Sequence, residues 1–209
     1  MKNLFFGGSS DLAVKLAKKL KNTDGISTKN VTAYYRKFFR VKKYLKSDFK
    51  NLSSKIYDKY DNILIFNGFY SSSFLSFFNS QDFLKNLKIN FLVPIEIASF
   101  IIQKKILKKN GAIFFISSIA SKETLIGNAY YSIAKNSLNF SAKILANEQL
   151  KRNIRINTIS LGLLRNKMGL EVKKITNTKK NYISFNHAIK EIKILLGNKK
   201  INKKNIKIY

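Results

Sequence analysis

Residues 3–20, NLFFGGSSDLAVKLAKKL, carry the pattern that decides the fold. Asn3 to Phe6 are typical of a short buried strand, and the small residues from Gly7 to Ser10 form a tight turn. From Leu12 onward the apolar residues fall at helical spacing, and we expect Asp11 to cap that helix. A strand, a turn of small residues and a helix together place a pyrophosphate at a helix N-terminus.

The rest of the chain continues this alternation of strands and helices. We expect strands at 30–35, 41–45, 62–66, 112–116, 154–161 and 206–209, and helices at 52–60, 84–108, 131–152 and 188–196. Pro94 should kink the second of these helices, and the segments 21–29 and 165–186 read as polar and irregular. Alternation of this kind predicts an α/β fold with a doubly wound, mostly parallel sheet and helices on both faces. No Pro- or Gly-rich linker divides the chain, so we expect one domain over residues 1–209.

Composition excludes several classes of protein. The chain has 209 residues, of which 45% are hydrophobic, enough for one domain with a core. It has no cysteine, which excludes disulfides and cysteine-ligated metals, and we expect no metal site. The apolar start breaks at Gly7, too early for a signal peptide, and no apolar run is long enough to span a membrane. We therefore expect a cytoplasmic protein with no membrane partner.

The formal charge of +29 would suit a nucleic-acid binder. However, the lysines are scattered over the whole chain, and arginine occurs only at positions 36, 40, 152, 155 and 165. There is no zinc-finger spacing and no RNA-binding aromatic signature. General residue bias explains the charge better, so we expect no specific nucleic-acid partner, although such a charge still attracts anionic ligands.

The stretch from Ser118 to Lys135, SIASKETLIGNAYYSIAK, contains groups that suit proton transfer. Tyr131 and Lys135 lie four residues apart, which on a helix puts them on one face. A nearby ammonium favours the phenolate and lowers the pKa of a tyrosine from about 10, so Tyr131 could exchange a proton near neutral pH. Ser118 follows a buried apolar run and could hold the substrate oxygen. The pattern alone is weak in a lysine-rich chain. Tyr130 is five residues from Lys135 and should face elsewhere.

Six motifs in order resemble those of the short-chain dehydrogenase/reductase family. They are GGSSDLA at 7–13 (similar to TGxxxGxG), Asn67-Gly68 (similar to NNAG), Asn90 in INFLVP, Ser118 thirteen residues before YxxxK at 131–135, LANE at 145–148, and RINTISLG at 155–162 (similar to RVNxIxPG). This resemblance implies a single-domain Rossmann fold and hydride transfer between a nicotinamide cofactor and a carbonyl or alcohol carbon. The small-molecule substrate is left open.

The resemblance also assigns roles. Tyr131 would be the acid or base, Lys135 would lower its pKa and hold the nicotinamide ribose, Ser118 would orient the substrate, and Asn90 would hold a water that relays protons. The cofactor-binding set would be Gly7, Ser9, Ser10, Asp11, Leu12, Arg36, Asp48, Asn67, Gly68, Tyr131, Lys135 and Gly162. The aromatic segment 69–83 could be core or substrate pocket, and core is favoured; His187, with no metal partners, is expected to be a surface residue.

This chain departs from the family pattern at several positions. Asp11 and Ala13 stand where the glycine turn usually has glycine, and a carboxylate near a phosphate should weaken cofactor binding. Leu161 replaces a proline, Asn166 stands near a usual threonine, and the pattern stops at Tyr209, before the family's usual tail. The alternative reading is therefore a non-catalytic binding or structural subunit with this fold.

Two further expectations concern the cofactor and the assembly. If the second strand is 30–35, it ends beside Arg36, which could bind the 2′-phosphate of NADP, so we expect NADP over NAD. The alternative is that Arg36 belongs to the general basic surface. The resemblance implies a homodimer or homotetramer through helices near 90–108 and 131–150. The apolar stripe Ala134, Leu138, Ala142 and Leu145 could instead face the protomer's own sheet.

Overall fold

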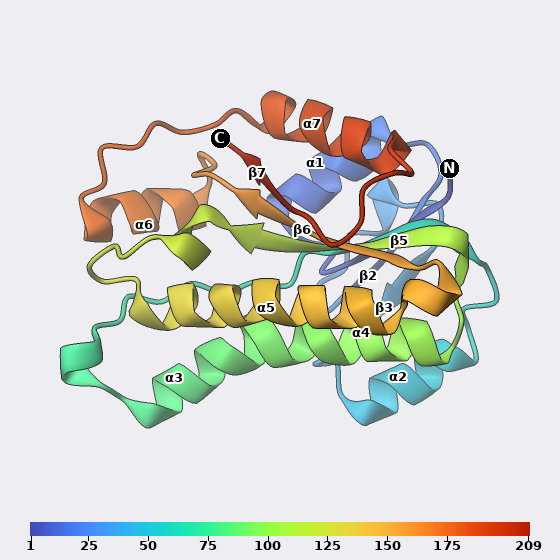
Figure 1. Ribbon diagram of the computed structural model, residues 1–209, viewed down its shortest axis with the longest axis horizontal. Coiled ribbons are helices and arrows are strands. Elements are labelled where there is room, and N and C mark those ends of the chain that lie inside the picture. Colours follow the sequence, from blue (N-terminus) through green and yellow to red (C-terminus); the bar gives the residue numbers. More distant parts are fainter.

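A single parallel sheet of seven strands forms the centre of the protein, in a computed structural model that describes residues 1–209 (Figure 1). The strands are β1 (Asn3–Phe6), β2 (Thr23–Ser27), β3 (Phe38–Arg40), β4 (Tyr60–Ile65), β5 (Leu107–Ser118), β6 (Arg155–Leu161) and β7 (Asn205–Ile208). Their order is β3-β2-β1-β4-β5-β6-β7, and every neighbouring pair is parallel. The order reverses between β1 and β4, which is the point where such sheets bind ligands.

Helices cover both faces of the sheet. They are α1 (Asp11–Lys19), α2 (Lys46–Ser53), α3 (Ser80–Leu87), α4 (Val93–Gln103), α5 (Ala129–Glu148), α6 (Lys167–Thr176) and α7 (Phe185–Gly197). Buried residues of α1 and α7 share one core cluster, and those of α4 and α5 share another with α2. Figure 1 shows α1 and α7 above the sheet and α4 and α5 below it. The α/β, doubly wound Rossmann fold expected from the sequence is confirmed.

The glycine turn connects β1 to α1. Gly7 adopts a φ of +69°, a conformation that favours glycine, and a Cβ there would lie 2.9 Å from the backbone nitrogen of Asn67. Ser10, rather than Asp11, caps α1, because its side-chain oxygen accepts a hydrogen bond from the N–H of Ala13. Asp11 is the first helical residue and is exposed. The expected capping role of Asp11 is therefore wrong.

The second strand was expected in the wrong place. The sequence TDGIS at 23–27 forms β2, whereas 30–35 holds only a short 3₁₀ turn, Thr32–Tyr34. The segment looks like a polar loop in the sequence because it contains Asp24, yet Asp24 is completely buried within β2. Its carboxylate accepts hydrogen bonds from Arg36 at 2.5 Å and from the hydroxyl of Tyr60 at 2.8 Å, so the buried charge is satisfied.

Several other boundaries differ from the expectations. The third strand is 38–40 rather than 41–45, and the next helix is 46–53 rather than 52–60. The long helix expected over 84–108 begins at Ser80, passes through a π-helical turn at Lys88–Leu92 and ends at Gln103. Strand β5 begins already at Leu107, and α6 forms within the segment expected to be irregular. The remaining strands lie within two residues of their expected positions.

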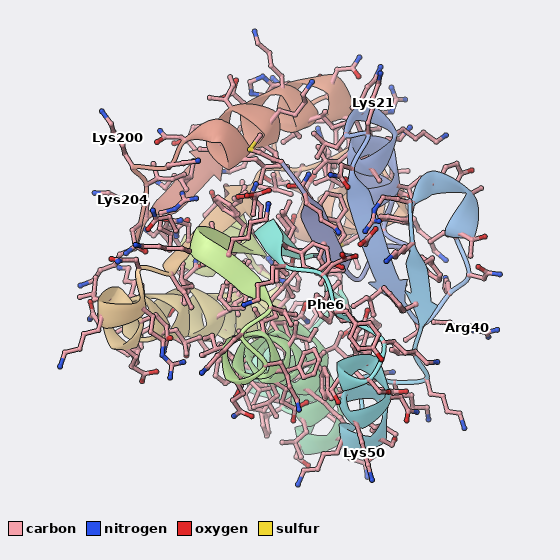
Figure 2. The ribbon with its side chains drawn as sticks, turned by 90° about the vertical axis from the view of Figure 1, so that its right-hand side faces the viewer. Phe6, Lys21, Arg40, Lys50, Lys200 and Lys204 are labelled. Atoms are coloured by element: carbon pink, nitrogen blue, oxygen red, sulfur yellow. The ribbon has the colours of Figure 1, made fainter.

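The basic residues surround the molecule. Figure 2 shows the labelled side chains of Lys21, Lys50 and Lys200 pointing outward from different elements, while Phe6 lies in the interior. This distribution agrees with general residue bias rather than one basic stripe. None of the helices combines the length and the apolar character needed to cross a membrane.

Candidate active site

Tyr131, Lys135 and Ser118 come together at the carboxyl end of β5. Tyr131 and Lys135 lie in the first two turns of α5, and the Lys135 ammonium nitrogen is 5.7 Å from the centre of the Tyr131 ring. Ser118 ends β5, and its hydroxyl lies close enough to Tyr131 to oppose the rise in the pKa of that tyrosine. Tyr130 is held elsewhere, since its hydroxyl accepts a hydrogen bond from the N–H of Asn79 at 2.6 Å. The structure therefore pairs Tyr131, and not Tyr130, with the lysine.

Burial dominates the acid–base properties of this pair. It raises the pKa of Tyr131 to about 12, against the smaller opposing effect of the Ser118 hydrogen bond. It also lowers the pKa of Lys135 to about 7. The lysine nitrogen donates to the carbonyl oxygens of Ile116 at 3.1 Å and Asn67 at 3.4 Å, with no carboxylate in contact. The expected near-neutral pKa of Tyr131 is thus wrong, because burial raises this pKa and the Lys135 ammonium is not among the groups that lower it.

Asn90 lies in the π-helical turn and is fully buried. Its side chain pairs with the backbone of Phe69, accepting from the N–H at 3.0 Å and donating to the carbonyl at 2.7 Å. It also donates to the side-chain oxygen of Asn86 at 2.7 Å. Pro94 has no N–H to donate to the Asn90 carbonyl four residues earlier, so ordinary helical pairing is broken at this residue. Sequence reasoning missed Asn86, although its i, i+4 spacing to Asn90 could have revealed it.

One pocket connects the glycine turn to the Tyr131–Lys135 pair. It runs from Ser10, Asp11 and Leu12 past Asn67 and Gly68 to Tyr131 and Lys135, and on to Gly162. Its far wall is formed by side chains that the sequence did not single out, among them Leu125, Leu163, Met168 and Val172. A Cβ on Gly68 would lie 3.6 Å from the Asn90 side-chain oxygen and 3.7 Å from the Lys135 nitrogen, so three of the motifs converge at this glycine.

This shape suits a dinucleotide in part. The continuous pocket joins a helix N-terminus to a buried Tyr–Lys pair, as a pyrophosphate and a nicotinamide ribose would require. The Asp11 carboxylate also lines it, and that negative charge opposes a phosphate. Asn166, near the position where we expected a cofactor contact, uses its side-chain oxygen to cap α6 at 3.0 Å from the Gly169 nitrogen. We found no group of histidine, cysteine, aspartate or glutamate residues arranged to hold a metal ion.

Tyr44 holds the first residue of the glycine turn, Gly7. Its hydroxyl accepts from the Gly7 N–H at 2.9 Å and donates to the Ile26 carbonyl at 3.1 Å. The tyrosine is buried and adopts a φ of +58°, which is strained for such a side chain. Ser9 lies close by, where its hydroxyl accepts from Ser27 at 2.7 Å. This contact network fixes the turn on the side of β2.

Asp48, expected to contact the cofactor near adenine, is held by the backbone of the loop before it. Its two carboxylate oxygens accept from the backbone N–H groups of Lys42, Lys43 and Leu45, each at 3.0 Å. These bonds hold the pKa of Asp48 below its usual value, although burial opposes them. Both oxygens are thus engaged at the start of α2, which gives Asp48 a structural role, and its contact with the cofactor stays a prediction.

Arg36 is at the wrong end of the sheet for a cofactor contact. Its backbone N–H donates to the carbonyl of Thr23, at the start of β2, whereas the glycine turn pairs with Ile26 near the end of that strand. The guanidinium binds Asp24 at 2.5 Å and Asp58 at 3.0 Å. The length of β2, about 13 Å for four residue steps, separates Arg36 from the turn. Its assignment to the NADP phosphate is therefore wrong.

Comparisons with known proteins agree with this fold. Residues 43–193 match a family model described as enoyl-(acyl carrier protein) reductase. Carbonyl reductase family member 4 of Xenopus laevis is 33% identical over 95 residues, which are 46% of this chain and only 40% of that protein. Among solved structures, a short chain dehydrogenase family protein from Francisella tularensis superposes with a TM-score of 0.84 at 19% identity, covering 99% of this chain and 96% of the other. The structure of ElxO with NADP bound superposes with a TM-score of 0.82 at 17% identity, covering 99% of this chain and 96% of the other. At these identities the structures show the fold alone.

Proposed function

Because the chain belongs to the short-chain dehydrogenase/reductase family, we propose that it is an NADP(H)-dependent oxidoreductase that interconverts a carbonyl and an alcohol. The observation that carries this proposal is the single pocket that connects the glycine turn to Ser118, Tyr131 and Lys135. The relative named carbonyl reductase supports the same reaction class. Four polar side chains at the family's positions, Asn90 included, argue for retained chemistry.

In this mechanism the bound nicotinamide would supply or accept the hydride, and the protein would position the substrate and move the proton. Tyr131 gives its hydroxyl proton to the carbonyl oxygen during reduction, and Ser118 holds that oxygen by a second hydrogen bond. Lys135 lies behind the tyrosine and stabilises the phenolate that forms. The Asn90 carbonyl lacks its usual helical donor, so it is suited to accept from a water that returns a proton toward Lys135.

The substrate side of the pocket is mostly apolar. Leu125, Leu163, Met168 and Val172 line it, and Val172 shares a small apolar cluster with Tyr131. Apolar walls with a few convergent polar groups favour a carbonyl compound whose remaining surface is hydrocarbon. The description of the matching family names an enoyl group on an acyl carrier protein, and such a group is likewise mostly hydrocarbon.

The NADP preference needs a different arginine from the one first expected. Strand β2 ends at Ser27, and the residues that follow, Thr28, Lys29 and Asn30, include no acid to bind the ribose hydroxyls of NAD. Arg40 ends β3 and is paired in register with Ser27, at the same edge of the sheet as the glycine turn. It is exposed, forms no ion pair and points away from the sheet edge in Figure 2. Arg40 therefore supports the proposed preference for NADP.

Replacing Tyr131 with phenylalanine tests the proposal. Tyr131→Phe should abolish NADPH oxidation with every compound in a panel of apolar aldehydes and ketones, because the proton donor is gone. Cofactor affinity, measured by fluorescence quenching, should stay nearly unchanged. Tyr130→Phe is the matched control and should retain turnover. Near-normal turnover in Tyr131→Phe together with its loss in Tyr130→Phe would show that the assignment is wrong.

A non-catalytic subunit remains the second candidate because of one observation. The Asp11 carboxylate stands at the N-terminus of α1, where it opposes an anionic cofactor. If the wild-type protein shows no melting shift and no fluorescence change with NADPH or NADH, this second function replaces the first.

We also propose a homodimer through α4 and α5. Ala134, Leu138 and Ala142 are buried within the protomer and Leu145 packs partly buried against the same core, so the stripe expected at the interface is not available. A different row on α5, Ile133, Phe140 and Ile144, is 36–64% exposed. Leu92, just before α4, is 45% exposed. A second copy would bury these side chains.

A further inference from the structure

Exposed apolar side chains gather on two loops that follow the carboxyl ends of the strands. Phe74, Leu75, Phe77 and Phe78 are 41–82% exposed, and Ile126 on the neighbouring loop is 76% exposed. We call these five residues the rim patch. Figure 1 shows the turn around residue 75, the start of α3 and α6 at the left end of the molecule, toward which the arrows of β5 and β6 point. Exposed apolar groups in one place mark binding surfaces more often than single ones do.

Hydrogen bonds fix the rim patch to the mouth of the active site. The N–H of Ser73 donates to the Gly127 carbonyl at 3.1 Å, and its hydroxyl accepts from the Tyr130 N–H at 2.9 Å. Phe74 lies beside Gly127, and its ring packs edge to face against that of Phe77, with 6.5 Å between the ring centres. Tyr130, which Ser73 binds, is followed in α5 by Tyr131. The patch is thus a well-bonded surface and does not result from a loosely held loop.

The chemistry around the rim patch favours an anionic surface. Helix α6 and the loop after it carry exposed Lys167, Lys174, Lys179 and Lys180, of which Lys180 pairs with Glu123. The exposed acids are Glu171 on α6 and Asp82 on α3, so the lysines outnumber them. Lys85 of α3 lies over the ring of Phe69 at 5.0 Å. Aromatic and leucine side chains bounded by lysines are typical of proteins that rest on a membrane without crossing it. The chain's net charge of +29 adds attraction at longer range.

We propose that the rim patch docks this end of the protein on the surface of an anionic phospholipid membrane. Phe77 and Leu75, the most exposed of the phenylalanine and leucine members, enter the interface, and the surrounding lysines contact the lipid phosphates. This contact revises the expectation of no membrane partner, and it involves no spanning helix. If the protein also has the proposed function, on which this consequence rests, docking lets hydrophobic carbonyl compounds reach Tyr131 from the lipid phase.

Vesicle sedimentation tests the docking without cofactor or substrate, so its result does not depend on the proposed reaction. The wild type should bind phosphatidylglycerol vesicles and bind phosphatidylcholine vesicles much more weakly. Phe77→Asp should lower the partition coefficient at least tenfold, about 1.4 kcal/mol. Tyr57→Asp is the matched control, because Tyr57 is 84% exposed against 82% for Phe77 and lies before β4, at the opposite end of the strands. The control should bind like the wild type.

Three results would overturn the proposal. The wild type could fail to bind phosphatidylglycerol vesicles, or both variants could weaken binding equally, which would indicate net charge alone. Phe77→Asp could also convert a wild-type dimer into a monomer in light scattering, which would assign the patch to a second copy. Melting temperatures check the folding of both variants, and Leu75→Asp, at 60% exposure, replaces Phe77→Asp if that variant unfolds.

Discussion

Replacing Arg40 with alanine should remove the preference for NADP. At neutral pH the 2′-phosphate adds between one and two negative charges, and Arg40 is an unpaired cation at the carboxyl edge of β3. A charge-assisted hydrogen bond contributes about 1.5–3 kcal/mol, and screening at an exposed site favours the lower figure. We therefore expect Arg40→Ala to weaken NADP binding about tenfold and to leave NAD binding unchanged.

Arg36→Ala is the matched control, because it removes the same side chain at the opposite end of β2. It takes one partner from the buried Asp24 carboxylate, which keeps the Tyr60 hydroxyl and the Lys37 N–H. We expect a loss of about 1–3 kcal/mol in unfolding free energy, seen as a lower melting temperature. The ratio of NADP to NAD affinity should not change.

Titration calorimetry with both cofactors at one fixed ionic strength measures these effects, and the salt must be constant because the protein is so basic. Equal wild-type affinities for NAD and NADP would refute the reasoning. An Arg40→Ala protein that still discriminates would refute it as well, and so would an Arg36→Ala protein that no longer does.

Three further predictions concern single residues. Burial lowers the pKa of Lys135 from 10.5 to about 7. At a pH between these two values the unfolded chain therefore binds a proton that the folded protein lacks. Wild-type stability should therefore rise with pH in that window relative to Lys135→Met, as measured by thermal melts, and parallel curves would contradict this. Asp11→Gly should tighten NADPH binding by removing a like charge at the N-terminus of α1, and unchanged fluorescence titrations would show that the carboxylate turns away. Phe140→Asp should turn a dimer into a monomer in light scattering, whereas a monomeric wild type would exclude the interface on α5.

The sequence predicted the parts of the fold that rest on continuous apolar runs. Strands β1, β4 and β6 are buried nearly throughout, and their apolar residues are visible without a structure. Strand β2 is equally buried, but Ile26 is its one large apolar residue and Asp24 lies within it. A charge that is satisfied only by distant residues, here Arg36 and Tyr60, cannot be recognised from local pattern.

The candidate site was predicted to a similar extent. Tyr131, Lys135 and Ser118 lie together because fixed spacings on a strand and a helix determine their positions. Arg36 was misassigned, since its position depends on where β2 ends. Spacing also gives no information on desolvation, so the high pKa of Tyr131 could not be foreseen.

The crossover between β2 and β3 has a consequence for dynamics. It contains only ten residues, 28–37, whereas parallel strands are usually joined by a dozen or more with a full helix. Here a single ring, that of Tyr35, takes the place of the helix: a Cβ on Gly25 would lie 2.7 Å from it, and its hydroxyl reaches the Gly8 carbonyl at 2.7 Å. A sheet edge covered by so little apolar surface should be the first part of the protein to open. In hydrogen exchange, the amides of β3 should lose protection well before those of β4 and β5, and the glycine turn would then loosen from the same side.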